Sequence, residues 1–277
     1  MSNAHRGIAF ALTVGLLLAG GCSGHRWHKH PVFVTEADAV RYLNQALESE
    51  LPDDRRDAVD QVARTRYLNH DVVLNALATI ARTDGSPAVR CAALVAMRRS
   101  QNPRVAATLV EVLEQSSTDP ERPTAFPPSA DIRLEALRTA IALAGQSHLP
   151  AEQQPTLRDM AVRLIGQERS RDIRQAAACL LGYCRDRVVL EPLIAALEQR
   201  DFGVVYQSER SLMRLTGQTF DYDPVGWRAW LEQTQDPFAE AGKLDAVLDA
   251  PPKGWFKRSI DNTRRTFATF TPKKDDM

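Results

Sequence analysis

The sequence contains none of the short motifs that mark the common catalytic and metal-binding sites. It has no Gly-rich phosphate loop, no HExxH, no GxSxG elbow and no CxxC pair. Its 35 basic residues are balanced by 35 acidic ones, so the basic surplus that attracts nucleic acid is missing. These absences predict a non-catalytic protein that holds no metal or cofactor and binds no nucleic acid.

Cysteine is also scarce, because beyond Cys22 the chain has only Cys91, Cys179 and Cys184. The last two are five positions apart on one predicted helix, which puts their Cα atoms about 8 to 9 Å apart. That separation is too large for a disulfide. Three thiols also leave one unpaired, which predicts buried, inert cysteines instead of a disulfide framework.

Aromatic residues make up only 6% of a chain that is 44% hydrophobic, which predicts a core of alanine, leucine and valine, as in helical proteins. Residues 170–199 show the pattern best. Their apolar side chains recur at helical spacing in two short segments, which predicts two helices joined by a tight turn. Asp186 is placed to cap the second helix. Neither helix can bury its apolar side alone, so the pair needs neighbours.

The same unit recurs along the chain. Residues 84–115 align without gaps on residues 168–199 at a constant offset of 84. The anchor positions of successive copies are 31 to 43 residues apart, as in helix-pair repeats. These anchors are Arg55, Arg90, Arg133, Arg174 and, in a degenerate fifth copy, Val205.

This pattern resembles the HEAT repeat family, in the short bacterial form also seen in phycobilin-lyase-type proteins. The resemblance covers about residues 50–233. It implies an all-α fold: a right-handed α-α superhelix, or HEAT-like solenoid, of about five helix pairs with capping helices over residues 36–233. A helix over residues 36–48 is expected to cap the open end. The residues that carry the resemblance are Asp172-Ile173-Arg174, Ala176-Ala177, Leu181-Gly182 and Leu193-Ile194-Ala195-Ala196-Leu197.

We interpret the four anchor arginines as structural. Each is expected to reach an acidic loop residue such as Asp84, Asp131 or Asp172, in its own or the next repeat. That would form a ladder of ion pairs between repeats. An anion-binding row along the same arginines is the alternative.

The N-terminal 21 residues predict a lipoprotein signal peptide. Arg6 precedes an apolar run of eleven residues, which is too short to cross the roughly 30 Å of a bilayer core. The ending Leu18-Ala19-Gly20-Gly21-Cys22 resembles the bacterial lipobox and implies lipidation of Cys22, ordinary secretion being the alternative. Residues 22–35 then form a tether, in which three histidines are interpreted as solvated and not as a metal site. Lipidation places the protein in the cell envelope, on the periplasmic side, and Ser23 after the anchor favours the outer membrane.

The last predicted unit carries two tryptophans. Gly217 is expected to end one helix in a left-handed conformation, and Asp223 with Pro224 is expected to begin the next. Trp227 and Trp230 lie on one face of that helix. They are candidate partner-binding residues, as a ligand cage, or else a hydrophobic lid over the last repeat.

Two further segments are candidate contact sites. The proline-rich insertion 116–129 rules out regular structure and offers Phe126 as an exposed anchor. A linker with a short helix, expected over 238–248, fills residues 234–252, and residues 253–277 form a basic amphipathic tail. The tail is expected to lie on an anionic membrane, dock in a partner's groove or pack on the solenoid. Its candidate contacts are Phe256, Lys257, Arg258, Arg264 and Arg265.

These observations predict a non-catalytic protein-protein interaction scaffold, lipid-anchored in the bacterial envelope. Its partners would be other envelope proteins, bound on a concave face formed by the second helices of the pairs. The alternatives are a bilin or tetrapyrrole lyase-like protein, suggested by the family resemblance, and a ligand-binding envelope lipoprotein that uses the two tryptophans.

Overall fold

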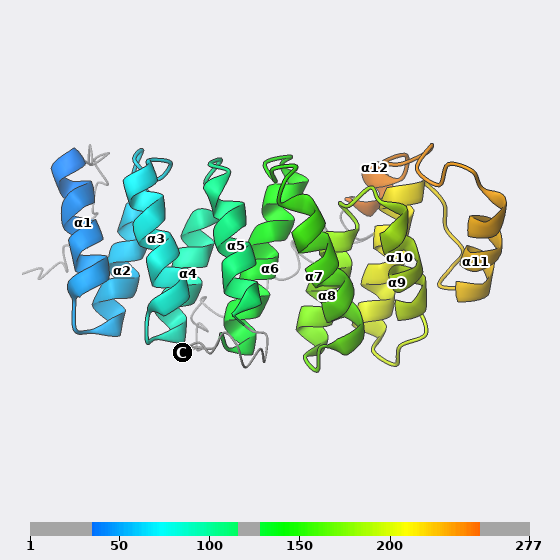
Figure 1. Cartoon of the computed structure of the whole chain (residues 1–277), viewed down its shortest axis with the longest axis horizontal. Helices are drawn as coiled ribbons and strands as arrows, with labels where there is room; N and C mark the ends of the chain where they lie inside the picture. The colour runs from blue at the N-terminus through cyan, green and yellow to red at the C-terminus, as the bar shows by residue number, and fades with distance from the viewer. Residues whose placement is uncertain (1–34, 116–127, 250–277) are drawn as a thin grey trace, which may run out of the picture. The chain divides into compact units, whose positions relative to one another are not determined.

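A computed structural model describes residues 35–115 and 128–249 of the chain. Within these two ranges the structure is helical, and no strand is present (Figure 1). The helices are α1 (Glu36–Glu48), α2 (Pro52–Ala63), α3 (Asp71–Thr83), α4 (Pro87–Met97), α5 (Arg104–Glu114), α6 (Ala130–Gly145), α7 (Gln154–Gln167), α8 (Arg171–Leu181), η1 (Arg187–Val189), α9 (Leu190–Ala196), α10 (Phe202–Thr216), α11 (Pro224–Gln233) and α12 (Asp245–Leu248). The all-α prediction is therefore confirmed for the described residues.

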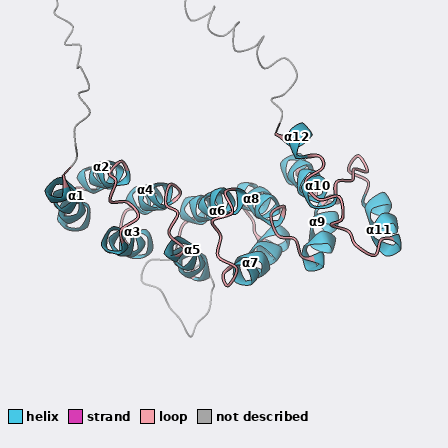
Figure 2. Ribbon diagram, turned by 90° about the horizontal axis from the view of Figure 1, so that it is seen from above, coloured by secondary structure: helices cyan, strands magenta, loops and turns pink. Residues whose placement is uncertain are grey.

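The helices lie in two layers (Figure 2). The first helices of the predicted pairs, α2, α4, α6, α8 and α10, each contact the next along one layer, and α1, α3, α5, α7, α9 and α11 do the same along the other. Between the layers, the second helices α3, α5, α7 and α9 pack mainly on the first helix of the following pair, as α3 does on α4. Consecutive helices that pack most closely therefore belong to two successive units of the repeat pattern, not to the same unit.

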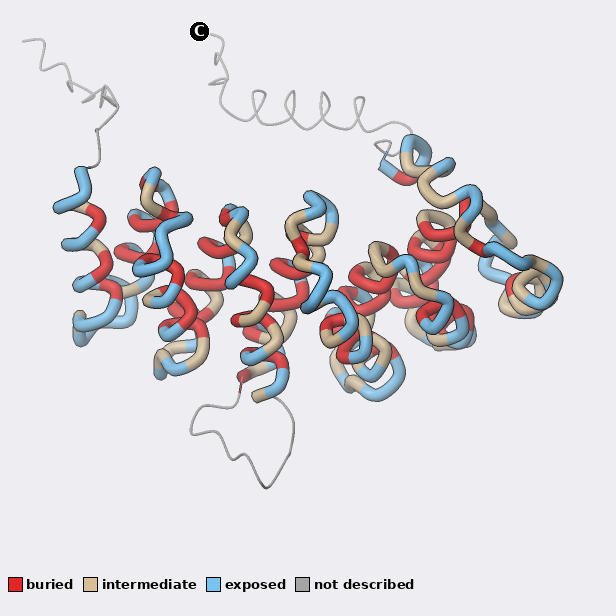
Figure 3. Tube along the Cα trace, turned by 45° about the horizontal axis from the view of Figure 1, so that its top comes forward, coloured by how far each residue is buried: buried red, intermediate tan, exposed pale blue. Residues whose placement is uncertain are grey.

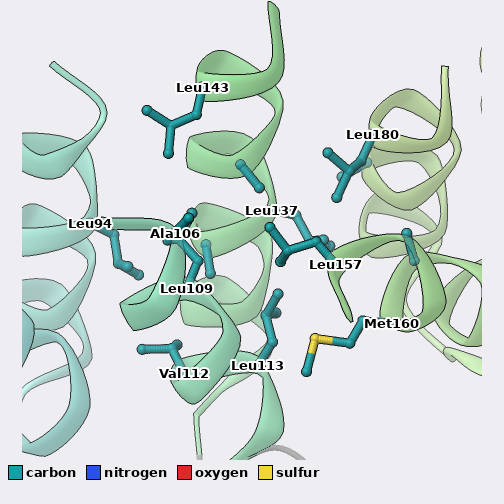
Figure 4. Close-up of a cluster of buried hydrophobic side chains, with 14 of the residues drawn as sticks. Leu94, Ala106, Leu109, Val112, Leu113, Leu137, Leu143, Leu157, Met160 and Leu180 are labelled. Atoms are coloured by element: carbon teal, nitrogen blue, oxygen red, sulfur yellow. The ribbon is translucent and has the colours of Figure 1, made fainter. Parts of the chain in front are cut away.

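A single cluster of buried apolar side chains runs between the layers from Leu43 in α1 to Trp227 in α11. The buried positions lie on the inner sides of the helices (Figure 3). At its centre, leucines from consecutive first helices meet leucines from α5 and α7 (Figure 4). Fully buried alanines such as Ala93 and Ala177 add little bulk between neighbouring helices. Because burial of apolar surface is the main stabilising term, each helix depends on its neighbours.

The predicted helix boundaries agree with the structure where a capping residue defines them. The Asp186 carboxylate accepts a hydrogen bond from the Val188 N–H at the start of η1, at 3.0 Å. Asp223 accepts one from the Val225 N–H at 2.9 Å, with Pro224 as the first residue of α11. Such caps satisfy backbone donors that the first helical turn leaves free.

The helix expected over 238–248 is shorter in the structure, where only α12 is helical and residues 237–244 form turns. Gly242 has a φ of +83°, which interrupts helical geometry, and its N–H donates to the Arg214 carbonyl of α10. Gly217 also takes the left-handed conformation expected of it, with a φ of +69°. A Cβ there would lie 2.3 Å from the Glu240 carbonyl oxygen, so this position requires glycine. The chain therefore folds back on α10 through two glycines.

Candidate functional site

The four anchor arginines share one set of contacts, with backbone carbonyls near the start of their own helix. Arg55 donates to Ser49 O at 2.9 Å, at the end of α1, and Arg174 donates to Glu168 O at 2.8 Å, at the end of α7. Cations at helix C-termini are stabilising, because the last carbonyls lack partners and carry partial negative charge. Arg90 donates to Ala81 O and Arg133 to Pro128 O. These contacts support a structural role.

The alignment of residues 84–115 on residues 168–199 also matches two glutamines, and each of them contacts one of these arginines. Arg90 Nη2 lies 3.2 Å from Gln115 Oε1, and Arg174 Nε lies 3.1 Å from Gln199 Oε1. Gln199 in turn donates to Ile165 O at the end of α7. The two arginines therefore occupy matching surroundings in two different repeats.

Two anchor arginines also form ion pairs that join consecutive pairs of helices. Arg55 reaches Asp84 at 2.8 Å, as expected, with both side chains largely buried. Arg133 reaches Glu168 at 3.0 Å and not Asp172, which pairs with its neighbour Arg171. Both contacts are of the expected kind, an anchor arginine on an acidic residue between helices, and for Arg133 that residue is Glu168.

Replacing Arg174 with methionine is expected to lower the free energy of unfolding by about 1 to 2 kcal/mol, because the partly buried Glu168 carbonyl at the end of α7 loses a charged donor. Urea unfolding followed by circular dichroism measures the change. Arg171→Met is the matched control, since that side chain is 74% exposed and surface changes of this kind cost at most about 0.5 kcal/mol. Equal effects of the two substitutions would rule out the capping role.

Trp227 does not face solvent, because the structure buries its side chain completely. Its indole Nε1 donates to Glu209 Oε2 at 2.8 Å, and Phe220 and Trp230 pack against it edge-on, with ring centroids 4.8 and 5.8 Å away. The Glu209 carboxylate is itself buried and also accepts from the Thr219 hydroxyl at 2.9 Å. This burial removes Trp227 from the candidate partner-binding residues and leaves Trp230, which is partly exposed.

Glu209 was not identified from the sequence. It follows Val205 by four positions and precedes Leu212 by three, so it interrupts the apolar face of α10. A carboxylate at such a position requires hydrogen-bond donors. Three donors satisfy it: the Trp227 indole, the Thr219 hydroxyl and the Phe220 N–H. A charged residue within the apolar face of a predicted helix is therefore the sequence signal that indicates this buried carboxylate.

Ion pairs connect most neighbouring helices on the surface formed by the second helices. Arg104 of α5 pairs with Asp71 of α3 at 3.3 Å, and Arg158 of α7 pairs with Asp186 before η1. Arg228 of α11 contacts two glutamates, Glu191 at 3.0 Å and Glu198 at 2.7 Å. Among the residues described, no ion pair joins α5 to α7.

A hollow of about 590 Å³ lies at this interruption. Its lining includes the apolar side chains of Met160, Val162 and Val188, together with Glu114 at the end of α5 and Arg163 of α7. Neither Glu114 nor Arg163 has an ion-pair partner within residues 35–115 and 128–249. The hollow therefore combines apolar surface with one acid and one base that remain available. We take it as the candidate binding site.

The three described cysteines are free and only partly buried, less than expected. Burial raises the pKa of each thiol, and raises that of Cys184 to about 11. Thiols with raised pKa values are poor nucleophiles at neutral pH, because the thiolate is the reactive form.

Compared with known proteins, the chain matches no family model and no curated protein. None of the described helices is long and apolar enough to cross a membrane. The described residues also include no cluster of three or more histidine, cysteine or carboxylate side chains able to hold a metal. The predicted lipidation site Cys22 and the predicted contacts Phe126, Phe256, Lys257, Arg258, Arg264 and Arg265 lie outside the described residues.

Proposed function

We propose that this chain is a non-catalytic interaction scaffold: a HEAT-like α-solenoid, wound as a right-handed α-α superhelix and anchored by lipid on Cys22. It would act in the bacterial cell envelope, on the periplasmic side. The two-layer packing supports the solenoid, since each helix contacts the next one along its layer. The matching contacts of Arg90 and Arg174 also support it. The N-terminal sequence supports the anchor.

The observation that carries the proposal is the hollow between α5 and α7. Repeat proteins bind partners on extended surfaces built from one helix of each repeat, and this hollow lies on the second-helix surface where the ion pairs are interrupted. Val188 is exposed there, beside the unpaired Arg163. An envelope protein that presents an apolar side chain next to a carboxylate fits this chemistry.

The experiment is crosslinking in cells that express the full chain, followed by purification from detergent-solubilised envelopes. Val188→Asp with Arg163→Glu is expected to reduce captured protein partners at least about tenfold, since interface anchors contribute about 1 to 2 kcal/mol each. Val72→Asp is the matched control, because Val72 is a 75% exposed valine on the same layer outside the hollow. An anchor with tether alone, residues 1–35, defines the background.

If the full chain captures no more protein than the anchor with tether alone, the scaffold proposal is wrong. Capture that survives the Val188→Asp and Arg163→Glu changes, but is lost on truncation of the helices, places the binding surface elsewhere and rejects the hollow.

A further inference from the structure

Three aromatic side chains form an exposed cluster at the start of α10. The Phe202 ring lies 6.1 Å from the Tyr206 ring and 6.0 Å from the Tyr222 ring, centroid to centroid. All three are exposed, Phe202 at 68%. We call Phe202, Tyr206 and Tyr222 the aromatic patch. Exposed aromatic clusters mark interaction surfaces, and this one is formed in a chain with few aromatic residues.

The backbone that holds Tyr222 in the aromatic patch is strained. Asp221 and Tyr222 have φ values of +51° and +69°, although neither is glycine. Side chains disfavour this left-handed region, so such residues persist where the surroundings hold them and cluster at functional sites. The strain places the Tyr222 ring next to Phe202 without burying either one.

The last described residues lie against the second half of α10, around Arg210 and Arg214. The Gly242 N–H donates to Arg214 O near the end of α10, and the Arg214 guanidinium contacts Asp249 at 3.1 Å. One turn earlier in α10, Arg210 Nη2 donates to Leu248 O at 2.5 Å. The Arg210 guanidinium also lies over the Tyr206 ring, 5.5 Å from its centroid. The Arg210 side chain therefore contacts both Leu248, next to the last described residue, and Tyr206 of the aromatic patch.

We propose that the C-terminal tail docks on the aromatic patch of its own chain. The tail carries Phe256, Ile260 and Phe267 at helical spacing, an apolar face that needs a partner. Residues 253–277 hold seven basic and three acidic side chains. Around the aromatic patch, Asp221 and Asp223 are exposed and supply the opposite charge.

The available length of chain permits this docking. Phe202 precedes Arg210 by eight residues of helix, about 12 Å at 1.5 Å per residue. From Leu248 to Phe256 the chain spans up to about 26 Å when extended. Phe256 can therefore reach every part of the aromatic patch. A membrane surface and a second copy of the chain are the other occupants that the test below distinguishes.

Limited trypsin digestion of the full chain in detergent tests the docking. Trypsin cleaves after the basic residues of the tail, and docking is expected to slow that cleavage at Lys257 and Arg258. Phe202→Ser with Tyr206→Ser is expected to speed cleavage roughly 30-fold, the factor that corresponds to losing a hot-spot contact, because proteolysis follows the population of the open form. The matched control is Val40→Ser with Val72→Ser, two exposed valines of α1 and α3 on the other layer.

A second pair of substitutions, Phe256→Ser with Phe267→Ser, leaves the described helices unchanged and is expected to give the same acceleration. Three results would overturn the proposal. These are equal cleavage rates in all variants, protection that increases with protein concentration, and protection that appears only with vesicles containing anionic lipid. The second result assigns the tail to another copy, and the third assigns it to the membrane.

Discussion

Replacing Trp227 with alanine is expected to lower the free energy of unfolding by about 4 kcal/mol. Truncation of a buried tryptophan costs about 3 to 5 kcal/mol through lost apolar contacts and the cavity left behind. Trp227 is completely buried in the last part of the core, between Phe220 and Trp230. Its loss also removes a hydrogen bond from the buried Glu209 carboxylate, which adds to the cost.

Urea unfolding, monitored by circular dichroism, measures this change against two companion variants. Trp227→Phe keeps a ring but removes the indole donor, so we expect an intermediate loss of about 1 to 3 kcal/mol. Trp230→Ala is expected to cost less than Trp227→Ala, because Trp230 is partly exposed. If the two alanine variants unfold at the same urea concentration, Trp227 does not hold the core in the way its burial indicates.

The burial of Trp227 argues against the alternative in which the two tryptophans bind a ligand. A cage for a sugar or a cation needs aromatic faces open to solvent, and Trp227 has none. The aromatic side chains with exposed faces lie instead at Phe202, Tyr206 and Tyr222. Aromatic recognition at this end of the chain is therefore better placed at the start of α10 than on α11.

Local signals in the sequence predicted the helices and several of their ends. Apolar residues at helical spacing predicted the helix over 36–48, and α1 has those bounds. Asp186, Gly217 and Asp223 were identified because capping chemistry involves only a few adjacent residues. The prediction of a helix over 238–248 was wrong because the conformation there depends on a contact between residues far apart in the sequence. Gly242 is held in its left-handed conformation by a hydrogen bond to Arg214, 28 positions earlier in the chain.

The contacts between repeats were harder to predict, because many acceptors lie within reach of a long side chain. Each anchor arginine was expected to reach an acidic loop residue, but the sequence did not single out Glu168 as the partner of Arg133. The carbonyl contacts of Arg55 and Arg174 depend on where the preceding helix ends in space. The hollow between α5 and α7 depends on the spacing of two helices, which no local pattern encodes.

Replacing Leu137 with alanine is expected to cost about 3 kcal/mol, within the range of about 2 to 5 kcal/mol for buried leucines. Leu137 lies on α6 and is completely buried at the centre of the core (Figure 4). Arg138→Ala is the matched control, since the next residue of α6 is exposed and its loss is expected to cost at most about 0.5 kcal/mol.

The shape of the unfolding curve is a stricter test of the proposed solenoid. In a repeat array, stability is a sum of repeat terms and nearest-neighbour interfaces, so a weakened α6 should uncouple the helices before it from those after it. We expect Leu137→Ala to broaden the urea transition or divide it in two. Hydrogen exchange should then show that α2 and α10 open at different free energies. A sharp single transition with equal protection of α2 and α10 would indicate a core that unfolds as one unit, contrary to the nearest-neighbour packing on which the scaffold proposal depends.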